Sequence, residues 1–543
     1  MTVYAEAITV GDLLVKGVAE HGETESLVFP DARLTNKDLL QGAMSFARGL
    51  YGLGVRRGDH VGILMPNCPE FAQLLFAVAM LGAVSVPINA RYRRKELAYV
   101  VENADLACLV TSDLIVDRVD YVQLLTDSLP SLASADNPES LDLPEAPRLR
   151  SIVLIGSREA PGVVSQKRFQ EISAQVDPAV VEVARARVRL RDVAMIVYTS
   201  GTTADPKGCL LTHEGLVRQW IAGGVRFEVR PGDKFWNPLP MFHLSGIGPL
   251  LFCVGLGATM LSMTQFEPDA ALDQIVEEQA THLYPCFPTV AMGVLRHPRY
   301  DRDAMRHVRV HAMVAPPDTR RLVQRLLPEG ARLTSAFGLT ECCGTVVANK
   351  LDETEDQRCE TSGPPIEGIE IRISDPETGA ERPTGEVGEI WVRGFSVFEG
   401  YHKDPEKTAA TLLPDGWCRT GDLGKLNADG LLTYVGRLKE MLKVGGENVA
   451  PAEIEDHLNK HPSVKLAVVV GRPDERYQEV PVAFVELLEG ATATEEELIE
   501  FCRGQLASFK LPREVRFVTE WPMSATKIQR FKLLEMLEDG KVE

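Results

Sequence analysis

The sequence lacks the features that mark several special classes of protein. Its ten cysteines include no CxxC pair, and the adjacent Cys342 and Cys343 cannot easily form an unstrained disulfide. We therefore expect a reduced, cytoplasmic protein that uses cysteine as a small apolar residue. The N-terminus has no basic start followed by an apolar core, so the sequence predicts no signal peptide.

Long apolar runs and positive charge are also scarce. The most apolar stretch, residues 246–263, is interrupted by Pro249, Gly255 and Gly257, which favours a buried core segment over stable membrane insertion. The chain has 58 Lys and Arg against 77 Asp and Glu, a net charge of −19. Such a surface repels a nucleic-acid backbone, so we expect no nucleic-acid partner. A local basic pocket for a phosphorylated ligand is still compatible with this balance.

What the first half does contain is an alternation of strand-like and helix-like segments. Apolar strand candidates at 60–65, 83–88 and 106–112 alternate with helical spacing over 69–82 and 95–104. This order predicts an α/β fold with a largely parallel sheet.

In the second half, the pattern of strand-like and helix-like segments changes twice. Short strands separated by turns begin near residue 365, and a strand–helix–strand pattern fills the C-terminal part. We predict a large N-terminal domain of α/β subdomains plus a β-rich subdomain, residues 1–436, and a small, mobile α+β domain, residues 437–543. Residues 128–150 are rich in Pro, Ser and acidic residues and predict a surface loop.

A loop rich in small hydrogen-bond donors stands out at residues 198–208, which read YTSGTTADPKG. Glycine lets a ligand approach the backbone, successive N–H groups form a concavity that binds anions, and Lys207 adds a positive charge. Both flanks are strand-like, and helical spacing begins only after Thr212, a suitable N-cap. The pattern predicts a phosphate-binding loop between two strands, unlike the strand–loop–helix of a P-loop NTPase. A solvent-exposed hairpin loop is the alternative.

Four further motifs follow in order. They are FGLTE (337–341), GWCRTGD (416–422), GRLKEMLKVGGEN (436–448) and PMSATKIQRFKL (522–533). With the loop, they make the sequence resemble the adenylate-forming superfamily of acyl-CoA synthetases, peptide-synthetase adenylation domains and beetle luciferases. The resemblance covers nearly the whole chain and is greatest to the acyl-CoA synthetases.

The resemblance implies a role for each matching residue. Contacts with the ATP phosphates are implied for Thr199, Ser200, Gly201, Thr202, Thr203 and Lys207. Contacts with the adenosine part are implied for Ala315, Phe337, Gly338, Asp422 and Arg437. Phe337 would stack on adenine, and Asp422 would accept hydrogen bonds from the ribose hydroxyls. The implied catalytic residues are Thr340 at phosphate, Glu341 on Mg²⁺, His243 beside the acyl carboxylate and Lys527 between carboxylate and α-phosphate. Lys443, Gly445 and Gly446 would face the CoA thiol, and Lys439 would be the domain hinge.

The reaction implied by the resemblance is ligation of a carboxylic acid to CoA with ATP and Mg²⁺. The acid first becomes an acyl-AMP, pyrophosphate is released, and the CoA thiol then takes the acyl group. An adenylating enzyme that loads a carrier protein is the nearest alternative. A non-catalytic nucleotide-binding protein would not need both Lys207 and Lys527.

The identity of the acid stays open at this point. The candidate pocket residues are His243, Gly246, Val314, Leu339 and Cys343. They are mostly uncharged, which favours an apolar tail, whether aliphatic, aromatic or polycyclic. Met313 and Val314 stand before Ala315 where the family often has two small residues, so the acyl site should be reshaped. The oligomeric state is open too, a homodimer included.

Overall fold

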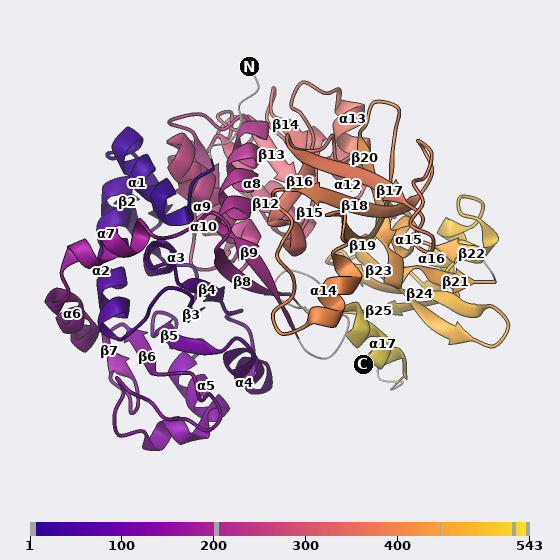
Figure 1. Ribbon diagram of the computed structural model, residues 1–543. Coiled ribbons are helices and arrows are strands. Elements are labelled where there is room, and N and C mark those ends of the chain that lie inside the picture. Colours follow the sequence, from indigo (N-terminus) through magenta and orange to yellow (C-terminus); the bar gives the residue numbers. More distant parts are fainter. Residues whose placement is uncertain (1–6, 200–205, 446, 524–527, 539–543) are drawn as a thin grey trace.

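Two seven-stranded sheets organise the larger part of the molecule (Figure 1). The structure is a computed structural model that describes residues 7–199, 206–445, 447–523 and 528–538. The first sheet has the order β7-β6-β5-β3-β4-β8-β9, and only β8 and β9 pair antiparallel. Its strands are β3 (His60–Leu64), β4 (Val84–Pro87), β5 (Leu106–Ser112), β6 (Ser151–Ile155), β7 (Val164–Ser165), β8 (Val193–Thr199) and β9 (Lys207–Thr212).

The second sheet has the order β14-β13-β12-β10-β11-β1-β2, with β1 and β2 as its antiparallel pair. Its strands are β1 (Glu25–Phe29), β2 (Ala32–Thr35), β10 (Lys234–Trp236), β11 (Thr259–Leu261), β12 (His282–Cys286), β13 (Val310–Met313) and β14 (Arg332–Thr334). Both sheets confirm the predicted α/β class with largely parallel pairing.

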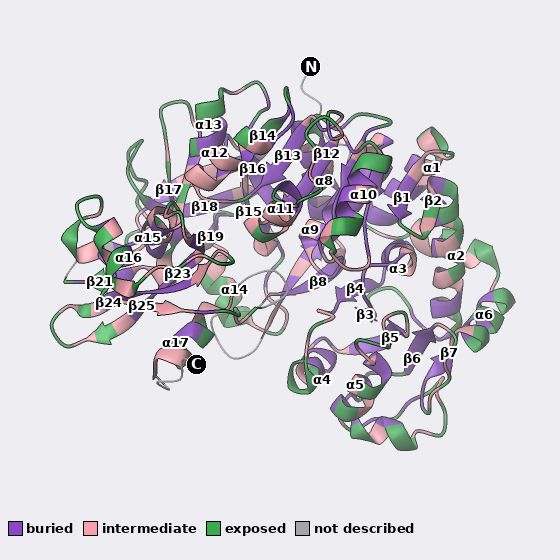
Figure 2. Cartoon of the chain, turned by 180° about the vertical axis from the view of Figure 1, so that it is seen from behind, coloured by how far each residue is buried: buried purple, intermediate pink, exposed green. Residues whose placement is uncertain are grey.

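The helices of these two layers are α1 (Val10–His21), α2 (Asn36–Gly52), α3 (Pro69–Met80), α4 (Arg94–Asn103), α5 (Tyr121–Ser128), α6 (Gln166–Gln175), α7 (Pro178–Arg185), α8 (His213–Arg226), α9 (Leu244–Leu256), α10 (Pro268–Glu277), α11 (Pro288–Leu295), α12 (Pro317–Leu326) and α13 (Glu355–Glu360). In Figure 2 the strands at the centres of the sheets are buried, whereas α6 and α13 expose much of their surface.

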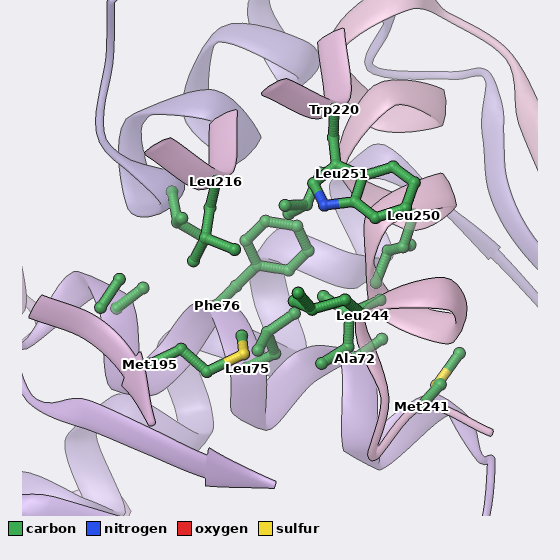
Figure 3. Close-up of a cluster of buried hydrophobic side chains, with 14 of the residues drawn as sticks. Ala72, Leu75, Phe76, Met195, Leu216, Trp220, Met241, Leu244, Leu250 and Leu251 are labelled. Carbon is green, nitrogen blue, oxygen red and sulfur yellow. The ribbon is translucent and has the colours of Figure 1, made fainter. Parts of the chain in front are cut away.

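The main core lies where α3, α8 and α9 pack between the sheets. Because α3 is apolar on nearly every face, it is stable only when surrounded by other elements. Phe76 of α3 is fully buried and points toward Leu216 and Trp220 of α8 (Figure 3). Gly248 of α9 is required here, since a Cβ at this position would lie 2.0 Å from the Trp220 ring.

Two smaller antiparallel sheets and a mixed sheet follow. The strands of the antiparallel sheets are β15 (Ala336–Leu339) with β16 (Gly344–Ala348), and β17 (Ile369–Ser374), β18 (Gly388–Gly394), β19 (Cys418–Leu426) and β20 (Leu432–Arg437). The mixed sheet contains β21 (Leu442–Val444), β22 (Glu447–Val449), β23 (Val464–Asp474), β24 (Gln478–Leu487) and β25 (Glu514–Phe517). The remaining helices are α14 (Pro405–Thr411), α15 (Pro451–Leu458), α16 (Glu495–Cys502) and α17 (Arg530–Glu538), with short 3-10 turns at Pro130–Ser134, Thr340–Cys342, Leu438–Glu440 and Ser508–Lys510. The predicted β-rich part and the smaller C-terminal α+β domain are therefore present.

The segment 128–150 corrects one prediction. Its backbone is irregular after the 3-10 turn at Pro130–Ser134, as expected. Its apolar side chains are nevertheless buried, with Leu143 and Leu149 each 1% exposed in the core beneath β5 and β6. Composition alone did not reveal that these leucines cover one face of the sheet.

The apolar stretch 246–263 is a core segment, as predicted. It folds into α9 and β11, and residues Leu250 to Val254 are almost wholly buried. Among the described residues, no helix has the length and apolar character needed to cross a membrane.

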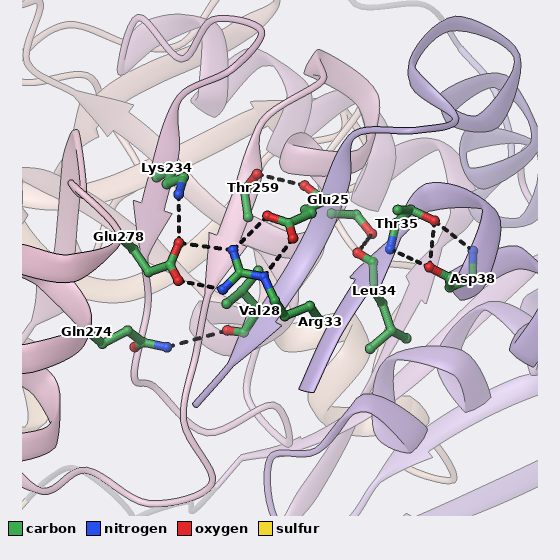
Figure 4. A network of polar contacts seen from close by, with 11 residues as sticks. Glu25, Val28, Arg33, Leu34, Thr35, Asp38, Lys234, Thr259, Gln274 and Glu278 are labelled. Carbon is green, nitrogen blue, oxygen red and sulfur yellow. Dashed lines mark hydrogen bonds and ion pairs between the residues drawn. The ribbon is translucent and has the colours of Figure 1, made fainter. Parts of the chain in front are cut away.

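A network of side-chain ion pairs links strands at the edge of the second sheet (Figure 4). The guanidinium of Arg33 on β2 donates to Glu25 on β1 at 2.6 Å and to Glu278 after α10 at 2.5 Å. Lys234 of β10 lies 2.6 Å from the same Glu278. The hydrogen bond from Arg33, the largest effect, and that from Lys234 lower the pKa of Glu278 to about 2.

Candidate active site

The predicted phosphate loop connects two antiparallel neighbours at the edge of the first sheet. Thr199 ends β8 and Lys207 begins β9, and the two residues face each other across the pair. The hydroxyl of Thr212 accepts a hydrogen bond from the N–H of Gly215 and so caps α8. The strand–loop–strand prediction is confirmed. Ser200, Gly201, Thr202 and Thr203 lie outside the described residues.

Lys207 is partly buried near charged side chains of both signs, the lysines Lys407 and Lys439 and the carboxylates of Glu341 and Asp404. Its Nζ is 5.6 Å from the centre of the Tyr401 ring. Burial lowers the pKa of Lys207, and the positive charges of Lys407 and Lys439 lower it further. Like charges repel one another unless an anion lies between them, so this arrangement favours a bound polyanion.

Glu341 is held by a residue that the sequence analysis did not identify. The hydroxyl of Tyr401 donates to Oε1 of Glu341 at 2.8 Å. The carbonyl oxygen of Glu341 also accepts a hydrogen bond from the N–H of Phe398 at 2.9 Å. Glu341 and Thr340 belong to the 3-10 turn Thr340–Cys342 that follows β15. The only sequence signal for Tyr401 is the loop-forming context of Gly400 and Pro405.

The aromatic residue of FGLTE lies in an antiparallel pair. Phe337 of β15 is 7% exposed, and its ring stacks on Tyr434 of β20 with 5.9 Å between the ring centres. Gly338 is required by the packing of this pair, because a Cβ there would lie 2.2 Å from the carbonyl oxygen of Gly344. Tyr434 is 42% exposed, so an aromatic surface is open beside Phe337.

Asp422 and Arg437 are brought together by strand register. They are direct partners across β19 and β20, and Arg437 Nε lies 3.1 Å from Asp422 Oδ1. Asp422 is only 3% exposed, and its N–H donates to the hydroxyl of Thr420. A nearly buried carboxylate beside an arginine is suited to binding hydroxyl groups and charge together.

The candidate acyl residues come from several elements. His243 precedes α9, and its ring centre is 4.9 Å from that of Phe242. Val314, just after β13, is 46% exposed, and Ala315 beside it is partly exposed. Cys343 is 1% exposed, and its sulfur packs against Gly215 of α8. The structure therefore places Cys343 in the core and leaves Val314 as the more accessible residue.

The residues expected to face CoA lie in the mixed sheet. Lys443 belongs to β21, where its N–H donates to Glu479 at 2.7 Å. Gly445 has a φ of 61°, a left-handed conformation that glycine adopts readily. Lys439, the predicted hinge, is exposed in the 3-10 turn Leu438–Glu440. Gly446 and Lys527 lie outside the described residues.

A magnesium site at Glu341 fits the donor chemistry. In the part of the chain that the structure describes, no three His, Cys, Asp or Glu side chains are grouped to hold a metal ion. Mg²⁺ commonly takes one or two carboxylates and completes its coordination with substrate phosphates and water. A single oriented carboxylate next to a phosphate loop meets that requirement.

Comparisons with known proteins agree with this arrangement. The AMP-binding enzyme family matches residues 14–402, and the AMP-binding enzyme C-terminal domain matches residues 453–527. A CoA ligase of Rhodococcus jostii (strain RHA1), named for a methyl-dioxo-octahydroindenyl propanoyl group, is 34% identical over 518 residues, 95% of this chain and 96% of that protein. The mitochondrial medium-chain acyl-CoA ligase ACSF2 of Macaca fascicularis is 31% identical over 543 residues, 98% of this chain and 87% of that protein.

A solved structure extends the likeness to three dimensions. The anthranilate CoA ligase AuaEII in complex with anthranoyl-AMP superimposes with a TM-score of 0.86 and 26% identity, covering 98% of both chains. The chain therefore belongs to the AMP-binding enzyme family and is an AMP-forming acyl-CoA synthetase, which uses ATP to convert a carboxylic acid to an acyl-AMP and then transfers the acyl group to CoA.

Proposed function

We propose that this enzyme activates an acid with an apolar tail, and that Lys207, Glu341 and Lys527 are the charged residues of the first step. A carboxylate oxygen attacks the α-phosphorus of ATP, the bond from that phosphorus to the bridging oxygen breaks, and pyrophosphate leaves with the electron pair. Two anions must approach each other, so positive charge has to be in place beforehand. The observation that carries the proposal is Tyr401, which contacts Glu341 through its hydroxyl and Lys207 through its ring.

The adenosine part of ATP is assigned to the second group of residues. Phe337 and Gly338 would lie against adenine, with Ala315 on the far side of the ring. Asp422 would accept hydrogen bonds from the ribose hydroxyls, and Arg437 would hold that carboxylate in position. The close pairing of Asp422 with Arg437 supports this assignment.

Bound Mg²⁺ would be held by Glu341 and would supply positive charge at the phosphate oxygens. Thr199 and Thr340 would donate hydroxyl groups to the phosphates, together with Ser200, Gly201, Thr202 and Thr203 of the loop. His243 would lie beside the acyl carboxylate. These roles follow from the family motifs. The ring contact of Lys207 with Tyr401, whose hydroxyl holds Glu341, supports them.

The thioester step is proposed to use a different arrangement of the C-terminal domain. Residues 437–543 would rotate about Lys439, which removes Lys527 from the carboxylate and brings Lys443, Gly445 and Gly446 to the CoA thiol. Lys460, in the turn after α15, and Asp318 of α12 form an ion pair at 2.5 Å, a contact that such a rotation would break. We further propose a cytoplasmic enzyme, with a homodimer as one assembly to test.

An apolar tail is favoured by the accessible residues and by the relatives. Val314 is exposed and uncharged at the candidate acyl site. The Rhodococcus relative is named for a bicyclic propanoyl group, and ACSF2 for medium-chain acyl groups. The acyl groups in both names are largely hydrocarbon, which agrees with an uncharged pocket.

The test is pyrophosphate release across a panel of acids, each with and without CoA. The panel contains medium-chain aliphatic, aromatic and bicyclic propanoic acids, with amino acids and short dicarboxylic acids as controls. We expect release with one apolar class and faster turnover when CoA is present. Release that is greatest with amino acids or dicarboxylic acids would contradict the apolar-tail proposal.

A further inference from the structure

A basic cavity lies beside the phosphate loop, and its charged residues other than Lys207 have no role in the reaction steps proposed above. Its volume is about 390 Å³, and β9, α4 and the segment leading into α14 line it. Lys207 and Tyr401 form part of the wall, and Lys403, Asp404 and Lys407 complete its charged lining. Three lysines against one aspartate leave a surplus of two positive charges in a protein whose net charge is −19.

The cavity lysines are only partly neutralised. Lys407 Nζ lies 3.0 Å from Asp404 Oδ2, and Lys403 Nζ lies 3.0 Å from Asp105 Oδ1 outside the lining. Lys403 also has a φ of 56°, which is uncommon for a residue with a Cβ and tends to mark functional loops. Lys407 is near enough to Lys207 for its positive charge to help lower the pKa of that lysine.

The position of the cavity connects it to the terminal phosphates of ATP. Lys207 belongs both to the phosphate loop and to the cavity wall. Tyr401 likewise lines the cavity while its hydroxyl holds Glu341, the proposed magnesium ligand. Asp422 and Arg437, the proposed ribose contacts, are not part of the wall. The cavity therefore begins at the phosphate end of the nucleotide site.

We infer that this cavity is a release site for inorganic pyrophosphate, with Lys403 and Lys407 receiving the anion as it leaves Lys207. The inference rests on the proposed function, since pyrophosphate is the product of the adenylation step. The same chemistry, a phosphate group on lysine, could also come from the 3′-phosphate of CoA, and the test separates these two sources. A highly charged product that remained on the loop would block the nucleotide site, and a neighbouring basic cavity offers it a route outward.

The test uses two substitutions with opposite expected effects. Lys407→Ala removes a cavity charge. Asp404→Asn removes the carboxylate that pairs with Lys407, while the asparagine oxygen can still accept from the N–H of Lys407 and cap α14. ATP–pyrophosphate exchange gives the KM for pyrophosphate. Removal of one partly exposed charge should change the KM for pyrophosphate by about threefold to tenfold. The KM should rise in Lys407→Ala and fall in Asp404→Asn.

The control variant is Lys425→Ala, an exposed lysine of β19 that does not line the cavity. It should leave the KM for pyrophosphate unchanged. An unchanged KM in Lys407→Ala, or a change of the same sign in both cavity variants, would overturn the inference. A higher KM for CoA but not for dephospho-CoA, without an effect on pyrophosphate, would assign the cavity to CoA instead.

Calorimetry of pyrophosphate binding to the same proteins separates this inference from the proposed function. It needs no turnover, so weaker binding to Lys407→Ala and tighter binding to Asp404→Asn would be seen even if no tested acid supports exchange. Absence of exchange with every acid would count against the proposed substrate class. Equal pyrophosphate affinity in the unsubstituted enzyme and the three variants would count against the cavity as a pyrophosphate site.

Discussion

The hydrogen bond between Tyr401 and Glu341 provides a sharp test of the metal assignment. Tyr401→Phe removes the hydroxyl that donates to Oε1 at 2.8 Å and keeps the ring beside Lys207. The ring also packs edge-to-face on Phe398, with 4.9 Å between the ring centres, and phenylalanine preserves that contact. Burial and, next, the negative charge of Glu341 raise the pKa of Tyr401, so the hydroxyl is a donor throughout the working pH range.

The expected magnitude follows from the strength of such a bond. A hydrogen bond to a charged group contributes about 1.5–3 kcal/mol, and loss of a partner that orients a metal ligand commonly lowers metal affinity or activity by about 10–100-fold. We therefore expect the Mg²⁺ concentration for half-maximal pyrophosphate release to rise by about tenfold or more. Binding of Mn²⁺ in the presence of a non-hydrolysable ATP analogue, followed by electron paramagnetic resonance, should weaken in parallel.

The control for Tyr401→Phe is a second tyrosine whose hydroxyl also donates a short hydrogen bond. The hydroxyl of Tyr300 donates to the carbonyl oxygen of Leu326 at 2.6 Å, away from the site. Tyr300→Phe should leave the Mg²⁺ requirement unchanged. If Tyr401→Phe responds to Mg²⁺ and Mn²⁺ as the unsubstituted enzyme does, then Tyr401 does not position a metal ligand.

Four further substitutions test separate parts of the scheme. Lys527→Ala should lower adenylation by about 10²–10³-fold and have less effect on thioester formation from supplied acyl-AMP; equal losses in the two half-reactions would contradict this role. Lys439→Pro should retain pyrophosphate release but lose CoA-dependent turnover, and normal turnover would refute the hinge. Because folding lowers the pKa of Glu278 from 4.5 to about 2, its ionised form stabilises the fold above pH 4.5, and this stabilisation is lost as the pH falls toward 2. Glu278→Gln should therefore flatten the acid-induced loss of stability by about 1–2 kcal/mol in urea titrations across that pH range. Phe76→Ala should lower the free energy of unfolding by about 3–5 kcal/mol, whereas the exposed Phe531→Ala should change it little in the same urea titrations.

Local sequence patterns predicted the strands, helices and helix cap that depend mainly on neighbouring residues in the chain. The period of apolar residues indicated the strand and helix order between residues 60 and 112, and β5 has the predicted bounds. Thr212 caps α8 as its residue type and position suggested. The loop before Lys207 could be placed between strands for the same reason, because its flanks have no helical period.

The sequence could not predict contacts between distant segments without geometry. Tyr401 lies 60 residues beyond Glu341, and no periodic pattern links the two. The partnership of Asp422 and Arg437 depends on the register of β19 and β20, which a turn of a different length would shift. The surface-loop prediction for 128–150 missed the burial of Leu143 for a related reason, since polar neighbours masked an apolar side chain that covers the sheet.

The charge distribution explains how an acidic protein can process three anionic substrates. Charges on the surface are screened over about 8 Å at physiological salt, so the lysines near the loop decide the local potential despite the net charge of −19. Burial is the main cause of the lowered pKa of Lys207, and the positive charges of Lys407 and Lys439 add to it. Bound ATP phosphates would offset both effects. Release of pyrophosphate needs the opposite property, a site that attracts the anion less strongly than the loop. Lys407 has this property, because Asp404 at 3.0 Å already offsets part of its charge. An anion that moves from Lys207 to Lys407 is therefore held progressively less tightly, and Asp404→Asn should slow its departure.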